Sequence, residues 1–503
     1  MGGLRACSTP CSAPALALLL ALVPQPLAAA SEGEEESDIR EQLTEREDEN
    51  RVEDPWTVTL FGNPLAVSGE YEILLEGTDP VLEGDTDPIA SSDAPLEDDR
   101  LLLEQELEGE LFYTLGEPLS FFAQARLRWD RDLLSETPNG ADDWYLERGE
   151  MWIFAADLFG SGIDLDVGRL EFEDDRRWWW DEELDAVRLE WEGGPEEAFG
   201  AELAFGSDLG RTRSDLSRLD PDEEDRLRVI GSLSWDTGGN HGIELFALYE
   251  HDRSGHEPIG GSVRPSREDE ADARLFWIGP RVLGAFVSES RWILGYWVDG
   301  GWVQGDETIV EFGDADDGGR LPVEGVARRD VSGWALDVGL LAIAAVPLEP
   351  RVTLTYAIGS GDDGEGRHDH AYRQSGLQAN ETSFGGVRRF PHYGRLLDPE
   401  LSNLTVATAG AGISLFDAST LDLVYHYYRL LERADELRDS NIETVFDGRH
   451  REVGHELDVQ LSIEEGDRFE IELSGSVFRA GAAFGSRSGD WAFGGLAALR
   501  VAF

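Results

Sequence analysis

Two common amino acids are almost or wholly missing from this chain. Its 503 residues include two cysteines, Cys7 and Cys11, and no lysine, so all 42 basic residues are arginine. Residues 1–30 have the pattern of a secretory signal peptide, with Arg5 ahead of an apolar run, Ala13–Val23, and small residues at 28–30. Both cysteines lie in that segment, so we expect a mature protein without disulfides or thiol chemistry.

Positive charge is scarce. The chain has 42 arginines and 103 aspartates and glutamates, which gives a formal net charge of −61. Phosphate backbones would be repelled by such a surface, so we expect no nucleic-acid partner. The use of arginine alone is compatible with fork-like recognition of carboxylate or phosphate groups, although a GC-rich coding bias would produce the same composition.

Long apolar runs are also missing. After residue 30 the longest run, Gly339–Leu348, has about ten residues, whereas a membrane-spanning helix needs about twenty. A secreted chain without helical spans or cysteines is a periplasmic protein, an extracellular protein or an outer-membrane β-barrel.

Motifs of enzymatic chemistry are absent as well. The sequence has no Gly-x-Ser-x-Gly turn, no His-Glu-x-x-His pair and no phosphate-binding loop. Nine histidines are scattered, and the triplet His368-Asp369-His370 in an acidic stretch is too weak a pattern to predict a metal site. We therefore expect no enzyme, no cofactor and no metal.

What the chain does contain is alternation with a period of two. In Leu119–Trp129 the odd positions are apolar, while the even ones include Gln124, Arg126 and Arg128. Segments of about ten residues with this pattern are typical of transmembrane strands. The same alternation recurs in Val67–Gly77, Phe199–Gly206, Ile243–Glu250, Val453–Ile463, Phe469–Arg479 and Trp491–Phe503.

The connections between these segments alternate in length. Short ones such as Leu115–Pro118 and Glu464–Asp467 alternate with long ones such as Gly301–Val331 and Gly361–Asn403, and residues 280–289 form the least clear turn. Short periplasmic turns and long extracellular loops are typical of outer-membrane barrels. We predict an all-β fold, an 18-stranded antiparallel transmembrane β-barrel from Val67 to Phe503; a secreted soluble β-protein is the alternative.

The predicted organisation has three parts. Residues 1–30 are the signal peptide, residues 31–55 an acidic disordered periplasmic lead, and residues 56–503 the barrel, with Trp56–Gly62 as an extension before its first strand. Eighteen strands enclose a space wider than side chains alone fill, so we expect an aqueous lumen.

Several arginines have the parity of the inner face. Arg126 and Arg128 alternate with apolar residues, and a hairpin symmetric about Gly116 would pair Glu106 with Arg126 and Glu104 with Arg128. Arg188 and Arg500 alternate with the apolar residues of their strands, so we expect both to face inward. A lipid-facing arginine at the bilayer midplane would cost about 2–4 kcal/mol, which supports this assignment. These arginines either stiffen the wall through ion pairs or also bind an anionic substrate.

Other charged positions are less regular. Glu147 and Arg148 cannot both face inward in a regular strand, and Arg169 and Arg479 share the apolar parity of theirs, so a bulge or snorkelling would have to accommodate them. The tract Glu171–Glu183, with three consecutive tryptophans, either folds inward as a constriction, where aromatic faces could bind sugar rings, or remains a solvated outer loop.

Residues 168–188 also carry a family resemblance. They read GRLEFEDDRRWWWDEELDAVR, which resembles the alginate-export family of outer-membrane barrels; Gly454–Val459 and Val477–Gly485 resemble its C-terminal strand pair. The resemblance implies an 18-stranded barrel whose arginine-rich constriction passes an anionic polyuronate. It also implies that Asp181, Asp185 and Arg188 are constriction residues, with Arg169 and Arg148 nearby.

We therefore predict a monomeric outer-membrane channel that passively conducts an anionic polysaccharide such as an alginate-like polyuronate. Its expected partners are that substrate, outer-membrane lipid and periplasmic export proteins. Two alternatives remain: a general or cation-preferring porin, favoured by the acidic excess, and a surface receptor or adhesin that binds through Gly361–Asn403.

Overall fold

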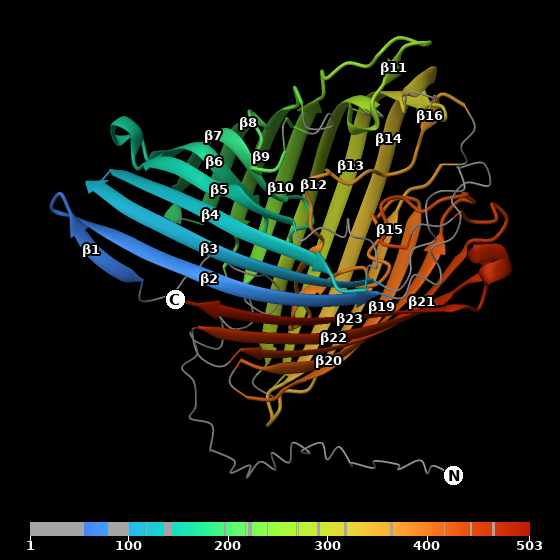
Figure 1. The fold of residues 1–503 in the computed structure, drawn as a ribbon. Helices are drawn as coiled ribbons and strands as arrows, with labels where there is room; N and C mark the ends of the chain where they lie inside the picture. The colour runs from blue at the N-terminus through green and yellow to red at the C-terminus, as the bar shows by residue number, and fades with distance from the viewer. Residues whose placement is uncertain are drawn as a thin grey trace, which may run out of the picture.

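Eighteen strands within the described part of the chain form one closed antiparallel barrel (Figure 1). The computed structural model describes residues 55–503 apart from 79–99, 117, 135–142, 196–197, 217, 220–223, 239, 268, 270, 289–291, 316–318, 363–365, 417, 443–444 and 465–467. The predicted signal peptide and nearly all of the acidic lead lie outside these residues. Among the described residues, no helix has the length and apolar character needed to span a membrane.

The wall strands follow one another in chain order. They are β2 (Asn63–Thr78), β3 (Arg100–Gly116), β4 (Leu119–Asp132), β5 (Asp143–Ala155), β6 (Ile163–Glu173), β7 (Asp181–Gly193), β8 (Phe199–Ser207), β9 (Leu227–Asp236), β10 (His241–His251), β12 (Ala271–Ser288), β13 (Trp292–Phe312), β14 (Leu321–Ala344), β15 (Arg351–Gly359), β19 (Leu404–Ser414), β20 (Thr420–Leu430), β21 (Glu452–Glu464), β22 (Phe469–Ala480) and β23 (Trp491–Ala502). The ring closes where β2 pairs with β23 as well as with β3.

The remaining elements are short and are not part of the wall. They are β1 (Trp56–Leu60), β11 (Ser262–Val263), β16 (His368–Asp369), β17 (Glu381–Phe384) and β18 (Val387–Pro391), with 3-10 turns η2 (Leu158–Gly160), η5 (Pro265–Arg267) and η6 (Ala482–Arg487). β1 pairs with Asn63–Val67 at the start of β2, before the pairing of β2 with β23 begins at Glu70. Trp56–Gly62 is thus an extension of the first strand and not a nineteenth wall strand.

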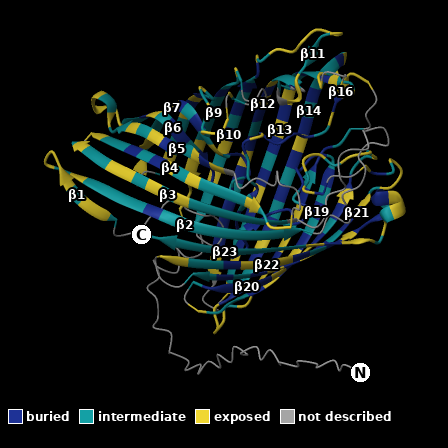
Figure 2. Ribbon diagram, in the orientation of Figure 1, coloured by how far each residue is buried: buried dark blue, intermediate teal, exposed yellow. Residues whose placement is uncertain are grey.

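Alternation along the strands separates an inner from an outer face (Figure 2). On β20 the residues Asp422, Val424 and His426 are buried, whereas Leu423 and Tyr425 between them are exposed. The exposed apolar residues form the lipid-facing surface, since burying them in hydrocarbon removes them from water.

Tryptophans mark the height of this apolar surface. Trp292 and Trp302 on β13 are both exposed on the outer face, and Trp302 pairs with the equally exposed Trp334 of β14. Strands that rise about 3.4 Å per residue at a tilt of about 45° separate Trp292 from Trp302 by about 24 Å along the barrel axis, close to the usual apolar band of about 25 Å.

Two predicted connections differ from the structure. Residues 280–288 continue β12, and the undescribed residues 289–291 separate it from β13, so the turn predicted at 280–289 is placed too early. Most of the predicted loop Gly301–Val331 is also strand, because β13 extends to Phe312 and β14 begins at Leu321. The apolar run Val282–Val287 pairs fully with β13, which explains why no turn residues mark it.

The long-loop end of the β6–β7 hairpin leaves the wall and folds into the barrel. β5 pairs with β6 only at Leu165–Arg169, while β6 and β7 remain paired as far as Glu173 and Asp181. Residues 170–184, here called the inner hairpin, are therefore detached from their neighbours in the wall. Of the two positions considered for Glu171–Glu183, the inward one is found.

A segment of the next long connection closes the gap that the inner hairpin leaves beside β5. The backbone N–H of Arg148 donates to the carbonyl of Thr212 at 2.9 Å, and that of Ser214 donates to the carbonyl of Leu146 at 2.9 Å. These bonds pair the edge of β5 that β6 would otherwise have covered.

Residues 372–403, here called the inner loop, occupy the barrel interior together with the inner hairpin. The backbone N–H of Asn380 donates to the carbonyl of Arg177 at 2.9 Å, and the indole of Trp178 donates to the hydroxyl of Tyr393 at 2.7 Å. Both segments belong to one buried apolar cluster with inward residues such as Val303. The expectation of an aqueous lumen is therefore wrong where this cluster fills the interior, along β8–β15 and at the long-loop ends of β19–β23.

Candidate functional site

The inner wall on the opposite side of the barrel carries charged side chains. Strand register sets Glu470, Arg500, Glu72, Glu106 and Arg128 side by side across β22, β23, β2, β3 and β4. The guanidinium of Arg500 binds Glu470 at 3.0 Å and Glu72 at 2.9 Å. This row, with the inward charges beside it, is called the charged wall below.

The predicted ladder between β3 and β4 exists, but its register is shifted by two residues. Glu108 lies opposite Arg126, and Glu106 opposite Arg128, because the hairpin is centred beyond Gly116 and not on it. Nε of Arg126 donates to Glu108 at 2.9 Å, and Arg128 pairs with Glu106. The ion-pair ladder is confirmed, and Arg126 also lies 3.8 Å from its predicted partner Glu106, whereas the residues directly opposite each other differ from the prediction.

One carboxylate connects the charged wall to the inner hairpin. Glu183 accepts from Arg126 at 2.7 Å through one oxygen and from Arg169 at 2.9 Å through the other. Arg169 reaches the interior because the chain is irregular at Gly168, which has a φ of +148° and lies so close to Met151 that a Cβ would collide with its carbonyl. The predicted irregularity at Arg169 is thus present.

Arg148 and Glu147 both reach ion-pair partners, despite being adjacent in one strand. Arg148 binds Asp185 at 3.0 Å, and Glu147 lies 3.2 Å from Arg128. A bulge in the β4–β5 register between Ala123 and Ala125 breaks the regular alternation there.

The remaining predicted residues also have defined positions. Arg188 binds Asp166 at 3.2 Å and faces inward, and Asp181 lies 3.6 Å from Arg177 near the tip of the inner hairpin. Arg479 remains on the outer face, where its guanidinium lies 5.6 Å from the ring centroid of Trp491.

The charged wall borders a cavity of about 200 Å³. It brings together two of the predicted residues, Arg126 and Arg500, and adds two arginines that were not predicted, Arg177 and Arg389. Seven carboxylates share the lining, so acids outnumber arginines in it: Glu70, Glu72, Glu108, Glu110, Glu150, Glu171 and Glu173. The lining is therefore acidic in balance and not arginine-rich. Arg177 and Arg389 belong to the segments that fold inward, which is why strand parity could not reveal them.

Three carboxylates of the inner hairpin lie close enough together to suggest a cation site. Oxygens of Glu171, Glu173 and Asp181 all lie within 4.8 Å of one another. Arg177 lies between two of them, at 2.7 Å from Glu173 and 3.6 Å from Asp181. Its guanidinium already supplies the neutralising charge, so the arrangement fits an ion-pair cluster better than a metal centre.

A second row of charges holds the tip of the inner hairpin. Register places Glu244, Arg281, Asp299 and Asp337 side by side across β10, β12, β13 and β14. From the hairpin, Arg176 binds Asp299, and the same arginine lies over the ring of Trp297 at 4.6 Å. We call this row and its hairpin partners the buried clamp.

The buried clamp is almost free of solvent. Arg281 and Asp299 are each 0% exposed, and Asp174 of the hairpin forms an ion pair with Arg281 at 2.5 Å. Sequence reasoning missed the clamp because the turn predicted at 280–289 removed Arg281 from any strand. Alternation extended through that segment would have found it.

The three tryptophans of the inner hairpin are packed and inaccessible. Trp178, Trp179 and Trp180 are between 1% and 3% exposed, and Trp179 stacks on Phe246 of β10 at 5.4 Å. Their faces are therefore covered and cannot serve as a platform for sugar rings.

The inner loop buries a histidine beside the clamp. Both ring nitrogens of His392 lack a hydrogen-bond partner among the described residues, and its ring lies 5.4 Å from that of Phe384. Burial, reinforced by the nearby guanidiniums of Arg176 and Arg281, lowers the pKa of His392 well below its usual value. The imidazole is therefore neutral and acts as a packed ring.

A closed antiparallel barrel with an apolar outer belt and a charged inner wall defines an outer-membrane β-barrel. Residues 92–492 match the family model described as alginate export, so the chain belongs to the alginate export family. That family consists of export barrels and not of enzymes.

Curated relatives agree with this assignment. The chain is 26% identical over 362 residues to the alginate production protein AlgE of Pseudomonas aeruginosa, covering 68% of this chain and 72% of that one. It is 25% identical over 337 residues to the AlgE protein of Pseudomonas syringae pv. tomato, covering 63% and 64%.

Solved structures match in fold alone. OccAB1 of Acinetobacter baumannii has a TM-score of 0.53 at 10% identity, covering 87% of this chain and 96% of that one. OccK5 (OpdH) of Pseudomonas aeruginosa has a TM-score of 0.50 at 9% identity, covering 87% and 98%.

Proposed function

We propose that this barrel passes an anionic polysaccharide of the alginate type across the outer membrane, and that the polymer follows the charged wall. The observation that carries the proposal is the convergence of Arg126, Arg177, Arg389 and Arg500 on one cavity. The family and the AlgE relatives support an acidic polysaccharide as the substrate class.

The mechanism follows from how the wall arginines are held. Arg126 and Arg500 each bind two carboxylates, so each guanidinium is oriented before any substrate arrives. A uronate carboxylate can replace one of these partners while the other remains, because a guanidinium offers several donors in a fixed fork. Neighbouring acids keep each such contact weak enough for the polymer to move on, as conduction requires.

A second candidate function rests on the same cavity. Its seven carboxylates and four arginines favour small cations over anions. A cation-preferring porin is therefore the alternative, and it predicts the opposite sign of selectivity.

Planar-bilayer recordings test both functions. We expect polyuronate to reduce the current of the wild-type channel, with a neutral glucan of similar length as the control. Replacing Arg126 and Arg500 by glutamate should weaken this block and shift the reversal potential toward cations. A wild-type channel that prefers cations and ignores polyuronate would support the porin, while a barrel without any conductance would support a surface receptor.

A further inference from the structure

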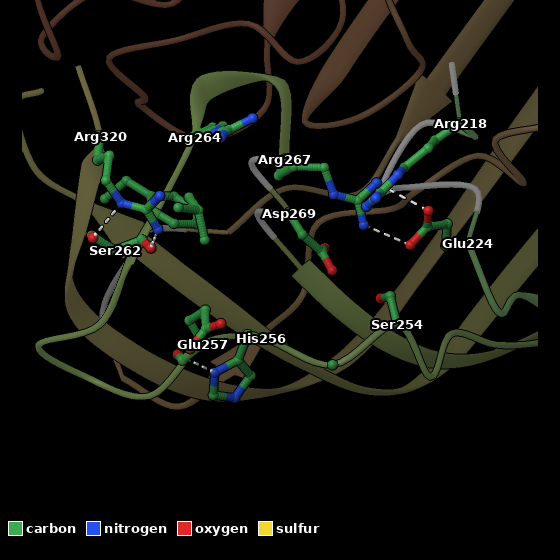
Figure 3. Close-up of a pocket in the computed structure, with 13 residues that line it drawn as sticks. Arg218, Glu224, Ser254, His256, Glu257, Ser262, Arg264, Arg267, Asp269 and Arg320 are labelled. Carbon is green, nitrogen blue, oxygen red and sulfur yellow. Dashed lines mark hydrogen bonds and ion pairs between the residues drawn. The ribbon is translucent and has the colours of Figure 1, made fainter. Parts of the chain in front are cut away.

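A second pocket lies at the end of the barrel that carries the long connections. Its volume is about 380 Å³, and its walls come from the three connections 208–226, 252–270 and 313–320 and from the adjoining strand ends. Figure 3 shows Arg218 and Arg267 beside Glu224, with Arg264 and Arg320 across the pocket. We call it the rim pocket.

The rim pocket reverses the charge balance of the chain. Acids outnumber arginines by 103 to 42 overall, yet four arginines and three acids line this pocket. The arginines are Arg218, Arg264, Arg267 and Arg320, and the acids are Glu224, Glu257 and Asp269. The cavity along the charged wall has the opposite balance, so this local excess of arginine does not merely follow composition.

Two of the four arginines are already engaged. Arg267 binds Glu224 through both ends of its fork, at 3.0 and 2.6 Å, and Arg320 donates to the hydroxyl of Ser262 at 2.8 Å. The guanidinium of Arg267 lowers the pKa of Glu224, so that pair stays ionised at neutral pH.

The other two arginines are available. The guanidiniums of Arg218 and Arg264 make no hydrogen bond or ion pair with any described part of the chain, although Arg218 lies close enough to Glu224 to contribute to lowering the pKa of that carboxyl. This sets them apart from the arginines of the charged wall, such as Arg126 and Arg500, which have carboxylate partners. Two guanidiniums in one pocket, each with donors left over, form a receptor for carboxylate groups.

We propose that the rim pocket binds a short uronate segment of the polysaccharide as it reaches the outer end of the barrel, with Arg218 and Arg264, on opposite sides of the pocket, each binding a carboxylate of that segment. This inference rests on the proposed function, because it takes the same polymer as its ligand. The hydroxyls of Ser254 and Ser262 are polar groups of the lining within reach of sugar hydroxyls. The volume lies in the range of small-ligand pockets, about 300–1,000 Å³.

The position of the pocket gives it a role that the charged wall cannot have. Long loops of outer-membrane barrels face the cell exterior, so a ligand bound there has already crossed the apolar band. A weak site at the exit holds the leading end of the polymer and opposes its return. Glu224, Glu257 and Asp269 keep the affinity low enough for release.

Calorimetric titration of the full chain in detergent micelles with tetragalacturonate tests the inference. We expect wild type to bind this probe but not neutral maltotetraose, and the pair Arg218→Gln and Arg264→Gln to weaken binding by about tenfold or more. The matched control is Arg274→Gln with Arg328→Gln, which removes the same charge from arginines that share Asp306 outside this pocket. The control should stay within about twofold of wild type.

Three results would overturn the inference. The wild-type protein could fail to bind tetragalacturonate, or it could bind with the same affinity as the Arg218/Arg264 variant. The third result is a loss of affinity in the control variant as large as that in the Arg218/Arg264 variant. Inorganic phosphate is the competing probe: a pocket that takes phosphate and not tetragalacturonate would be a site for phosphorylated headgroups instead.

Bilayer recordings keep this inference separate from the proposed function. One outcome is that polyuronate blocks the wild-type current and Arg126→Glu relieves the block, while the Arg218/Arg264 variant binds tetragalacturonate as wild type does. In that case the inference about the rim pocket fails and the proposed function stands. If polyuronate does not alter the wild-type current in any way, the proposed function fails, whatever the rim pocket binds.

Discussion

The two sides of the barrel interior handle charge differently. In the buried clamp, Arg281 and Asp299 are completely covered and hold the inner hairpin in place. Along the charged wall, Arg126 and Arg500 are partly exposed and border a cavity. The same residue types thus anchor the filling of the barrel on one side and remain accessible on the other. A passage for a polar substrate belongs to the accessible side.

The difference follows from desolvation. Ions removed from water need complete pairing, and removal of one partner leaves a costly uncompensated charge. Partly exposed pairs gain little and can exchange partners at small cost. Inward parity alone therefore does not identify transport residues, because both rows have it.

The largest expected effect comes from breaking the clamp. Asp299→Ala leaves Arg176 and Arg281 without a shared buried partner, and we expect a loss of about 3–5 kcal/mol in the free energy of unfolding. Urea titration of the refolded barrel in phospholipid bilayers measures it.

The same strand offers a matched control for that substitution. Asp306 also binds two arginines, Arg274 and Arg328, but these side chains are 53% and 56% exposed. Asp306→Ala should cost only about 0–1 kcal/mol. Equal losses in the two variants would contradict the distinction between buried and accessible charge.

A smaller effect is expected in selectivity when the wall loses one carboxylate. Glu183→Gln removes the acid that Arg126 and Arg169 share, so the anion-to-cation permeability ratio should rise roughly twofold. Reversal potentials in a salt gradient measure this ratio. The control is Glu250→Gln, whose partner Arg228 lies buried in the packed region, and it should leave the ratio unchanged. A change of the permeability ratio in the control alone would place the passage in the packed region and not along the charged wall.

The smallest expected effect concerns pH. The pKa of His392 is lowered in the folded state, so its contribution to stability is complete above the ordinary value of 6.5 and is lost as pH falls below it. Between pH 7 and pH 5.5 wild type should lose about 1 kcal/mol more than His392→Phe, which keeps the ring packed on Phe384. Urea titrations at the two pH values compare the variants, and parallel losses would mean that His392 does not titrate on unfolding.

The sequence was sufficient for the barrel but not for its contents. Alternation predicted the eighteen strands, because one-sided exposure to lipid imposes a period of two on every wall strand. It also predicted the inward direction of Arg126, Arg188 and Arg500. It did not predict that the lumen side of β8–β15 is packed with aromatic residues, since a loop buried inside a barrel has no period to recognise.

Local irregularities account for the other differences. The β3–β4 hairpin is centred beyond Gly116, which shifts the residue opposite Arg126 by two positions, and the irregularity at Gly168 turns Arg169 inward. Arg281 was missed because the turn predicted at 280–289 removed it from any strand. The run Val282–Val287 is apolar at both parities, so alternation did not mark it as part of a wall strand. Bulges depend on the fit of neighbouring strands, so a single segment read alone does not reveal them.

The central claim is that the accessible route follows the charged wall and not the packed region. The chain has no cysteine except Cys7 and Cys11, so single cysteines can report access. Ser68→Cys places a thiol beside Glu110 on the charged wall, and Ala335→Cys places one in the packed cluster. A charged methanethiosulfonate reagent should reduce the single-channel current of the Ser68→Cys barrel and leave that of the Ala335→Cys barrel unchanged. Current loss for Ala335→Cys without any for Ser68→Cys would contradict the claim.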